Sequence, residues 1–169
     1  MTFVRFLMLL ALVVWIGGII FFAFVMAPAL FTILPSRELA GTVVSRSLGA
    51  LHWIGIGCGV VFVLASITET YYRMRALRMF AVRNLLVTAM LALTLVSQVV
   101  VGGRMRQLRA SMGTIDAVAA TDARRAEFDS LHQWSTRLEG LVLLFGLVAL
   151  FDTTRAWSKP QTRGTATAA

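Results

Sequence analysis

The chain has 169 residues, of which 58% are apolar and 14% charged, and its net charge is +8. An ordinary soluble domain has roughly 25% charged residues, so the composition excludes that class. In a soluble protein such a high positive charge would suggest nucleic-acid binding. Here the arginines lie mostly just outside long apolar stretches, where they anchor helices to anionic head groups. We therefore expect a protein of the lipid bilayer that binds no nucleic acid.

Three uncharged stretches predict membrane-spanning helices. Phe6–Met26 has 21 residues, Leu48–Ile67 has 20 and Asn84–Val101 has 18. A hydrocarbon layer of about 30 Å needs about 20 residues in helical form, and a helix satisfies its own backbone polar groups there. The first stretch is longer than the apolar core of a signal peptide, so we expect it to be retained as a helix.

A fourth span is less obvious from the sequence. Gly140–Phe151 gives only 12 uninterrupted apolar residues, and an extension back to Leu131 reaches 21 but includes Arg137 and Glu139. Near the end of a helix, Arg137 can reach the head groups, and Glu139 costs less there than the ~2.5–3.5 kcal/mol of a central charge. We therefore predict four spans rather than three.

The predicted fold is all-α: a polytopic four-helix transmembrane bundle with long helical extensions of the third and fourth helices. We expect one membrane domain over residues 1–157, with spans near 4–30, 46–70, 79–108 and 122–153, and a disordered tail over 158–169. Thr121 or Asp122 is expected to cap the start of the fourth helix.

Basic residues divide evenly between the two sides that four spans create. The side of the termini has Arg5, Arg73, Arg75, Arg78, Arg83, Arg155, Lys159 and Arg163, and the other side has Arg37, Arg46, Arg104, Arg106, Arg109, Arg124, Arg125 and Arg137. On the first side the charges lie closer to the helix ends, which favours cytoplasmic termini. The preference for arginine over lysine suggests a bacterial origin, and hence the cytoplasmic (inner) membrane.

Polar side chains recur on one face of three predicted spans. The second span has His52, the third has Gln98, and the fourth has His132, Ser135 and Glu139. Because the direction of successive helices alternates, these positions lie at the same end of the bundle. The sequence therefore predicts a polar cavity at one end of the bundle, lined by these five side chains.

Glycines on the predicted spans indicate close contact between helices. Gly55 and Gly59 are four residues apart on one face, and Gly17, Gly18 and Gly146 offer similar positions on the first and fourth spans. Small residues at this spacing let helix backbones approach one another. The same glycine faces could also join two copies of the chain or dock another protein.

Two other residues inside the predicted spans have structural interpretations. Glu69 has Arg73 four residues later, so we expect a solvated ion pair at the end opposite to the cavity. Trp15 is expected to lie in the core or to face lipid.

Two blocks of residues resemble one family. The first block is Trp15-Ile-Gly-Gly18 with Phe22, Pro28, Phe31, Leu34-Pro35 and Ala40-Gly41, followed by His52-x-x-Gly55, and the second is Phe128-x-x-Leu131-His132-x-x-Ser135. The chain thereby resembles the DUF4149 proteins, bacterial relatives of transmembrane protein 205, from about Leu7 to Leu150. The resemblance implies a four-helix membrane protein of no established biochemical activity.

No spacing of residues indicates a nucleotide loop, a zinc-protease motif or a Ser–His–Asp arrangement, so we favour a protein that is not an enzyme. The first hypothesis is that it binds or passes a small solute or metal ion at the polar cavity, with His52 and His132 as metal ligands, since imidazole and carboxylate suit divalent transition metals. The second is a redox subunit in which the same two histidines ligate a haem. The third is a structural or assembly partner of a larger membrane complex. The sequence assigns no cofactor.

Overall fold

The computed structural model describes residues 2–74, 82–113, 118–119 and 121–158. Its helices are α1 (Thr2–Phe21), a π-helical segment (Phe22–Met26), α2 (Ala27–Ile33), α3 (Arg37–Met74), α4 (Val82–Leu95), a second π-helical segment (Val96–Val101), α5 (Gly102–Met112) and α6 (Ala123–Ser158). They join into four rods that are long and apolar enough to cross a membrane. The predicted all-α, four-span fold is confirmed, including its charged fourth helix.

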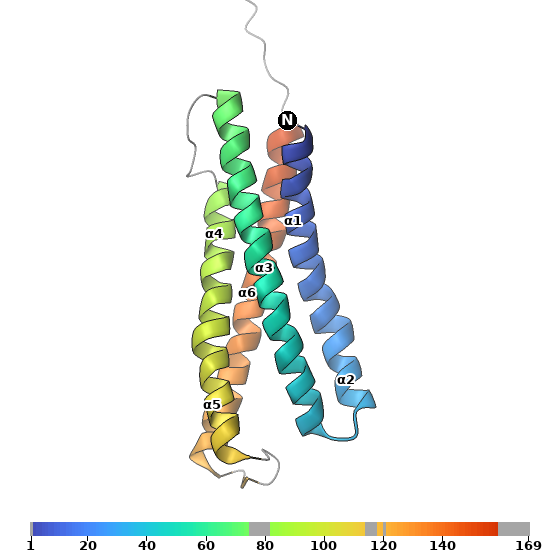
Figure 1. Ribbon diagram of the computed structural model, residues 1–169, viewed down its shortest axis with the longest axis vertical. Coiled ribbons are helices and arrows are strands. Elements are labelled where there is room, and N and C mark those ends of the chain that lie inside the picture. Colours follow the sequence, from blue (N-terminus) through green and yellow to red (C-terminus); the bar gives the residue numbers. More distant parts are fainter. Residues whose placement is uncertain (1, 75–81, 114–117, 120, 159–169) are drawn as a thin grey trace, which may run out of the picture.

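The four rods run up and down in alternation (Figure 1). α1 packs along α3, α4 packs along α6, and α3 joins the two pairs through α4. The start of α1 and the end of α6 lie at one end of the bundle, and α2, α5 and the start of α6 lie at the other (Figure 1). Ser158 closes α6, and the rest of the predicted tail, 159–169, lies outside the described residues.

The core lies where the rods meet around Trp15. This indole is 1% exposed, and Met8 and Phe62 are fully buried with it. Met90 and Val142 close the same cluster from α4 and α6. Of the two positions expected for Trp15, the core is the one it occupies. In lipid these contacts stabilise the bundle chiefly by close packing, because lipid tails are as apolar as the core.

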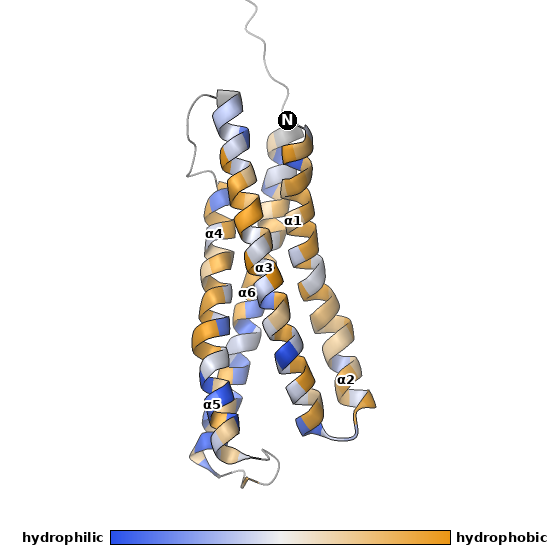
Figure 2. Ribbon diagram, viewed as in Figure 1, coloured by the Kyte–Doolittle hydropathy of each residue, from blue (hydrophilic) through white to orange (hydrophobic). Residues whose placement is uncertain are grey.

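The outer surface of the rods is also apolar. Phe24, Leu64, Leu85 and Phe151 are each more than half exposed. Figure 2 shows hydrophobic residues along most of the bundle, and hydrophilic ones gathered around α5 at the lower end. An exposed apolar surface of this extent suits contact with a lipid bilayer.

Two glycines of α3 make room for side chains of other helices. A Cβ added at Gly55 would overlap the ring of Trp15, and one added at Gly59 would lie 2.6 Å from Cδ2 of Leu91. Real Cβ atoms do not approach other atoms so closely, so both positions require glycine at this helix spacing. The α3 glycine face therefore packs inside the bundle.

The other predicted packing glycines differ from one another. A Cβ at Gly18 would lie 2.7 Å from Cδ1 of Leu51, and one at Gly146 would lie 2.8 Å from Cγ1 of Ile16. At Gly17, no described atom lies within 4 Å of that position. Gly18 and Gly146 therefore pack tightly within the chain, whereas Gly17 does not.

The first π-helical segment, Phe22–Met26, has a cause in the sequence. The backbone N–H of Ala27 donates to the carbonyl of Phe22, five residues back. Pro28 follows directly, has no N–H to donate and crowds the carbonyl four residues earlier. The turn before Pro28 therefore widens from α to π, and the helix continues into α2 instead of ending.

The second π-helical segment, Val96–Val101, ends at a glycine. The backbone N–H of Gly102 donates to the carbonyl of Ser97, and a Cβ at Gly102 would lie only 3.2 Å from that oxygen. Glycine thus lets the wide turn close without crowding. Gln98 lies within this turn, so the local geometry sets the direction of its side chain.

The start of α6 is capped as expected. Oδ1 of Asp122 accepts a hydrogen bond from the backbone N–H of Arg124 at 2.8 Å, which satisfies one of the free donors of a helix start. The hydrogen bond from the Arg124 side chain lowers the pKa of the Asp122 carboxyl. The predicted cap at Asp122 is confirmed.

Candidate functional site

Three of the five predicted cavity residues meet in one hydrogen-bonded group. Nε2 of His52 lies 2.9 Å from Oε2 of Glu139, and Nδ1 lies 3.0 Å from Oε1 of Gln98. His52 is 3% exposed, and the three side chains come from α3, α6 and the second π-helical segment. We call His52, Gln98 and Glu139 the polar triad.

Two glycines on α3 shape the space around His52. A Cβ at Gly49, three residues before His52, would lie 3.6 Å from Nε2 of Gln98. Three residues after it, Gly55 accommodates the ring of Trp15. The small residue on one side lets the amide reach the imidazole, and the one on the other lets the ring of Trp15 approach α3 one turn away.

The helix that carries Gln98 has further buried polar groups. The hydroxyls of Thr94 and Ser97 are buried, and neither has a hydrogen-bond partner within the described part of the chain. A buried polar group without a partner is uncommon, and π-helical turns are frequent at functional sites. Both features occur within one turn of Gln98.

The triad can hold a proton in more than one arrangement. Carboxylate oxygens of Glu139 only accept, so Nε2–H of His52 donates to Oε2. On the other side Gln98 has both an acceptor oxygen and an NH₂ donor, and rotation of the amide exchanges them. Nδ1 of His52 can therefore be protonated against Oε1 or unprotonated against the NH₂ group, and it is hydrogen-bonded in both states.

The other two predicted cavity residues are not part of the triad. His132 is exposed and lies two helical turns, about 10.5 Å, before Glu139 on α6. Ser135 is half-buried, and among the described residues neither its hydroxyl nor the ring of His132 forms a hydrogen bond. The described residues also contain no group of three or more His, Cys, Asp or Glu side chains that could hold a metal ion.

A second buried ionic group lies at the opposite end of the bundle and corrects one prediction. Glu69 is 2% exposed, and its two oxygens accept from Nε of Arg5 at 2.7 Å and from Nη2 of Arg83 at 3.0 Å. The predicted solvated environment of Glu69 is therefore wrong, and two of its partners come from other helices. The side chain of Arg73 lies outside the described residues.

The same alternation of helix directions that located the triad could have found this cluster. Arg5 begins the first span, Glu69 ends the second and Arg83 begins the third, so all three lie at one end. Buried carboxylates are paired because an isolated charge in an apolar medium is very costly. The prediction considered only the spacing to Arg73 along one helix and not the arginines of other helices.

Comparison with known proteins identifies the family of the chain. The family model described as Domain of unknown function (DUF4149) matches residues 10–114, which include His52 and Gln98 but neither His132 nor Glu139. No curated protein and no solved structure matches the chain. The match covers more than half of the chain and begins in α1, where the first block of resembling residues also begins. The chain therefore belongs to the DUF4149 family, and its four apolar helices indicate a multi-pass membrane protein.

Proposed function

We propose that this protein is not an enzyme but passes protons, alone or with a small polar solute, through the polar triad in a bacterial inner membrane. The observation that carries the proposal is the 2.9 Å contact between the His52 ring and the Glu139 carboxylate, which come from different membrane-spanning helices. Kinship with transmembrane protein 205 is part of the proposal and rests on the two sequence blocks alone.

The cost of the triad supports a functional role. A charged side chain at the centre of a membrane-spanning helix costs about 2.5–3.5 kcal/mol, and less toward the helix end, where Glu139 lies. Such groups mark solute paths and proton relays. A purely structural hydrogen bond between membrane helices contributes only about 0.6 kcal/mol. A carboxylate–imidazole pair therefore costs more free energy than a hydrogen bond between helices returns, so helix packing alone does not account for it.

The alternative functions fit the site less well. An axial haem ligand needs a free ring nitrogen, but Glu139 and Gln98 occupy both nitrogens of His52. The pair His52 and Glu139 offers a divalent metal two donors, and His132 is about two turns away. A partner protein cannot dock against Gly55, because Trp15 of the same chain already packs on that glycine.

We expect proton flux to depend on the triad. In vesicles that contain the purified protein and a pH-sensitive dye, an imposed pH gradient should collapse faster than in protein-free vesicles. His52→Gln and Glu139→Gln each keep a polar side chain of similar size but remove the ionisable group, so the flux should fall to the protein-free rate. The initial rate of dye response measures it.

His132→Gln is the matched control, because it removes an exposed imidazole from the same end of the bundle. It should keep the wild-type rate. If the pH gradient collapsed no faster in vesicles with the wild-type protein than in protein-free vesicles, the proposal would be refuted. Equal rates for His52→Gln and the wild type would reduce the triad to a packing contact.

We further propose that both termini face the cytoplasm, so that the triad lies toward the periplasmic side. A reporter fused after Ser158 should be active only as a cytoplasmic reporter, and one inserted after Gly113 only as a periplasmic reporter. Measured activities of the two fusions check the prediction. The opposite pattern would reverse the orientation, and the same side for both would contradict four spans.

A further inference from the structure

Three arginines lie between the triad and the nearer end of the bundle. Arg109 of α5 is held in place: its Nη1 donates to Oγ1 of Thr42 on α3 at 3.2 Å, and its guanidinium lies 5.6 Å from the ring centre of Phe128 on α6. Gly41 adds room for it, since a Cβ there would lie 3.2 Å from Nη2 of Arg109. Arg109 therefore connects three helices.

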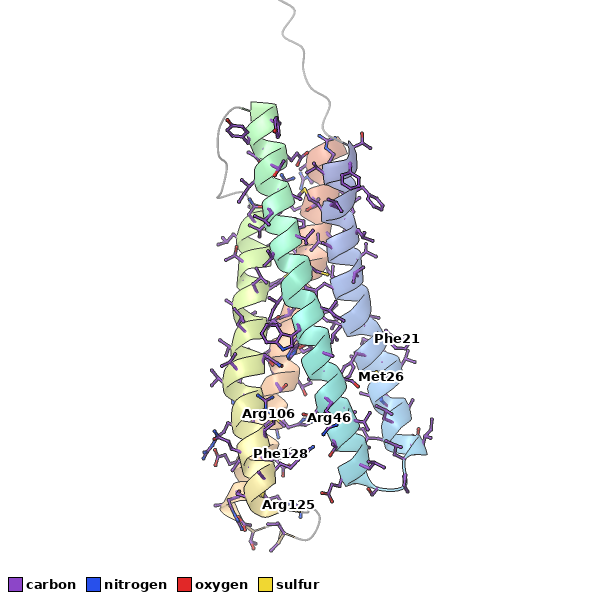
Figure 3. All side chains as sticks on the ribbon, in the orientation of Figure 1. Phe21, Met26, Arg46, Arg106, Arg125 and Phe128 are labelled. Atoms are coloured by element: carbon purple, nitrogen blue, oxygen red, sulfur yellow. The ribbon has the colours of Figure 1, made fainter. Side chains whose placement is uncertain are left out.

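Two more arginines lie one turn nearer to the triad along their helices, and both are exposed. Nη1 of Arg106 lies 3.3 Å from the place that a Cβ would take at Gly102 of the same helix. Arg46 is four residues after Thr42 on α3, and Arg106 is three residues before Arg109 on α5, so each shares a helix face with its neighbour. α3 and α5 run in opposite directions (Figure 1). Both steps thus lead the same way along the bundle, by about 4.5–6 Å, so the backbones of Arg46 and Arg106 lie at a similar level. Figure 3 shows both side chains at this lower end.

The carboxylates of this end do not neutralise these arginines. Glu127 pairs with Arg104 at 2.7 Å and Asp122 pairs with Arg124 at 2.8 Å, while Glu139 pairs with His52. Glu38 and Asp129 complete the acidic residues of α3, α5 and α6 at this end. Within the described part of the chain, none of the five forms an ion pair with the three arginines.

We propose that Arg46, Arg106 and Arg109 bind a small phosphate- or carboxylate-bearing anion in front of the triad. Like charges at one level repel each other, and an anion between them removes that repulsion and accepts several charged hydrogen bonds. Guanidinium groups present planar forks that match both phosphate and carboxylate. The inference rests on the proposed function, because it names the class of solute that the triad would pass with a proton.

The same chemistry could come from the head group of an anionic lipid. The position of Arg109 favours a soluble anion, because it is half-buried and its guanidinium contacts α3 and α6 rather than the outer surface of the bundle. Arg46 and Arg106 are exposed, so a head group at the outer surface can also reach them. The experiment therefore tests both sources.

Inorganic phosphate is the probe. Added to the wild-type protein in an uncharged detergent at constant ionic strength, it should raise the unfolding temperature with a saturating dose dependence. The double variant Arg46→Gln/Arg106→Gln should bind phosphate at least tenfold more weakly. Arg155→Gln removes an arginine from the opposite end of α6 and should bind like the wild type. Arg46→Lys/Arg106→Lys keeps the charge and should fall between the two.

The outcomes separate the two proposals. Equal phosphate binding by the wild type and by the double glutamine variant would overturn the anion site, as would stabilisation by phosphatidylglycerol but not by phosphate. His52→Gln should still bind phosphate, since it leaves the arginines in place. Loss of proton flux in His52→Gln with no phosphate binding by the wild type would keep the proposed function and discard the anion.

Discussion

Gly55→Ala should destabilise the bundle more than its single added methyl group would suggest. The new Cβ would overlap the Trp15 ring, which is 1% exposed and surrounded by the core. Neither the ring nor α3 can move without disturbing other contacts. We expect the free energy of unfolding to fall by about 1–3 kcal/mol or more, the usual range for overpacking a core. Unfolding of the purified protein by a denaturing detergent measures it.

Gly57→Ala is the matched control, two residues away on the same helix. No described atom lies within 4 Å of its new Cβ, and alanine favours a helix over glycine by up to about 1 kcal/mol. It should therefore leave stability unchanged or raise it. Trp15→Phe combined with Gly55→Ala should recover part of the loss, because the smaller ring frees space. Equal effects of Gly55→Ala and Gly57→Ala would show that α1 and α3 do not pack closely here.

The fold could be predicted from the sequence, because membrane-spanning helices are recognisable as long apolar runs. The least certain helix was α6, whose charge at Glu139 counted against insertion. The structure gives a physical reason why it inserts: Glu139 contacts His52, so the charge is not left alone among lipid tails. A hydropathy sum treats each residue singly and cannot include such a partner.

The site was predictable in part. Alternating helix directions brought together His52, Gln98 and Glu139 correctly, but the same reasoning also included His132. His132 and Glu139 are seven residues apart and so share a face of α6, but a shared face does not ensure a shared neighbour. α6 also packs against α5 at this end, and His132 there is exposed. Helical periodicity predicts directions, whereas burial depends on where the other helices lie.

The π-helical turn around Gln98 could not have been foreseen. Gly102 was visible in the sequence, but a glycine permits several conformations and selects none of them. At the other π-helical segment, Pro28 gave a stronger signal, because a proline inside a helix must disturb the preceding turn. The exact direction of Gln98 thus depends on a feature that only the structure provides.

Glu69→Gln should cause the other large loss of stability, through charge rather than through volume. The change leaves the buried Arg83 without its carboxylate, while Arg5 is partly exposed. Removing one partner of a buried ion pair typically costs about 3–5 kcal/mol, because the remaining charge is uncompensated. Unfolding by a denaturing detergent should show a loss of this size.

Glu127→Gln is the control, because it breaks an ion pair whose two side chains are largely exposed. Water and head groups can solvate Arg104 after the change, so the stability should hardly alter. A similar loss in Glu69→Gln and Glu127→Gln would mean that the buried cluster is solvated as well.

The double variant Glu69→Leu/Arg83→Leu separates pairing from burial. Removing both charges leaves no buried ion alone, and well-packed apolar residues often replace a buried pair at no loss. Arg83 also has a buried Nε without a partner in the described part of the chain, so its removal abolishes an unsatisfied donor. We therefore expect the double variant to be more stable than Glu69→Gln, with Arg5 turning toward the head groups. A double variant as unstable as the single one would show that the cluster fastens α1, α3 and α4 through its hydrogen bonds rather than by neutralising charge.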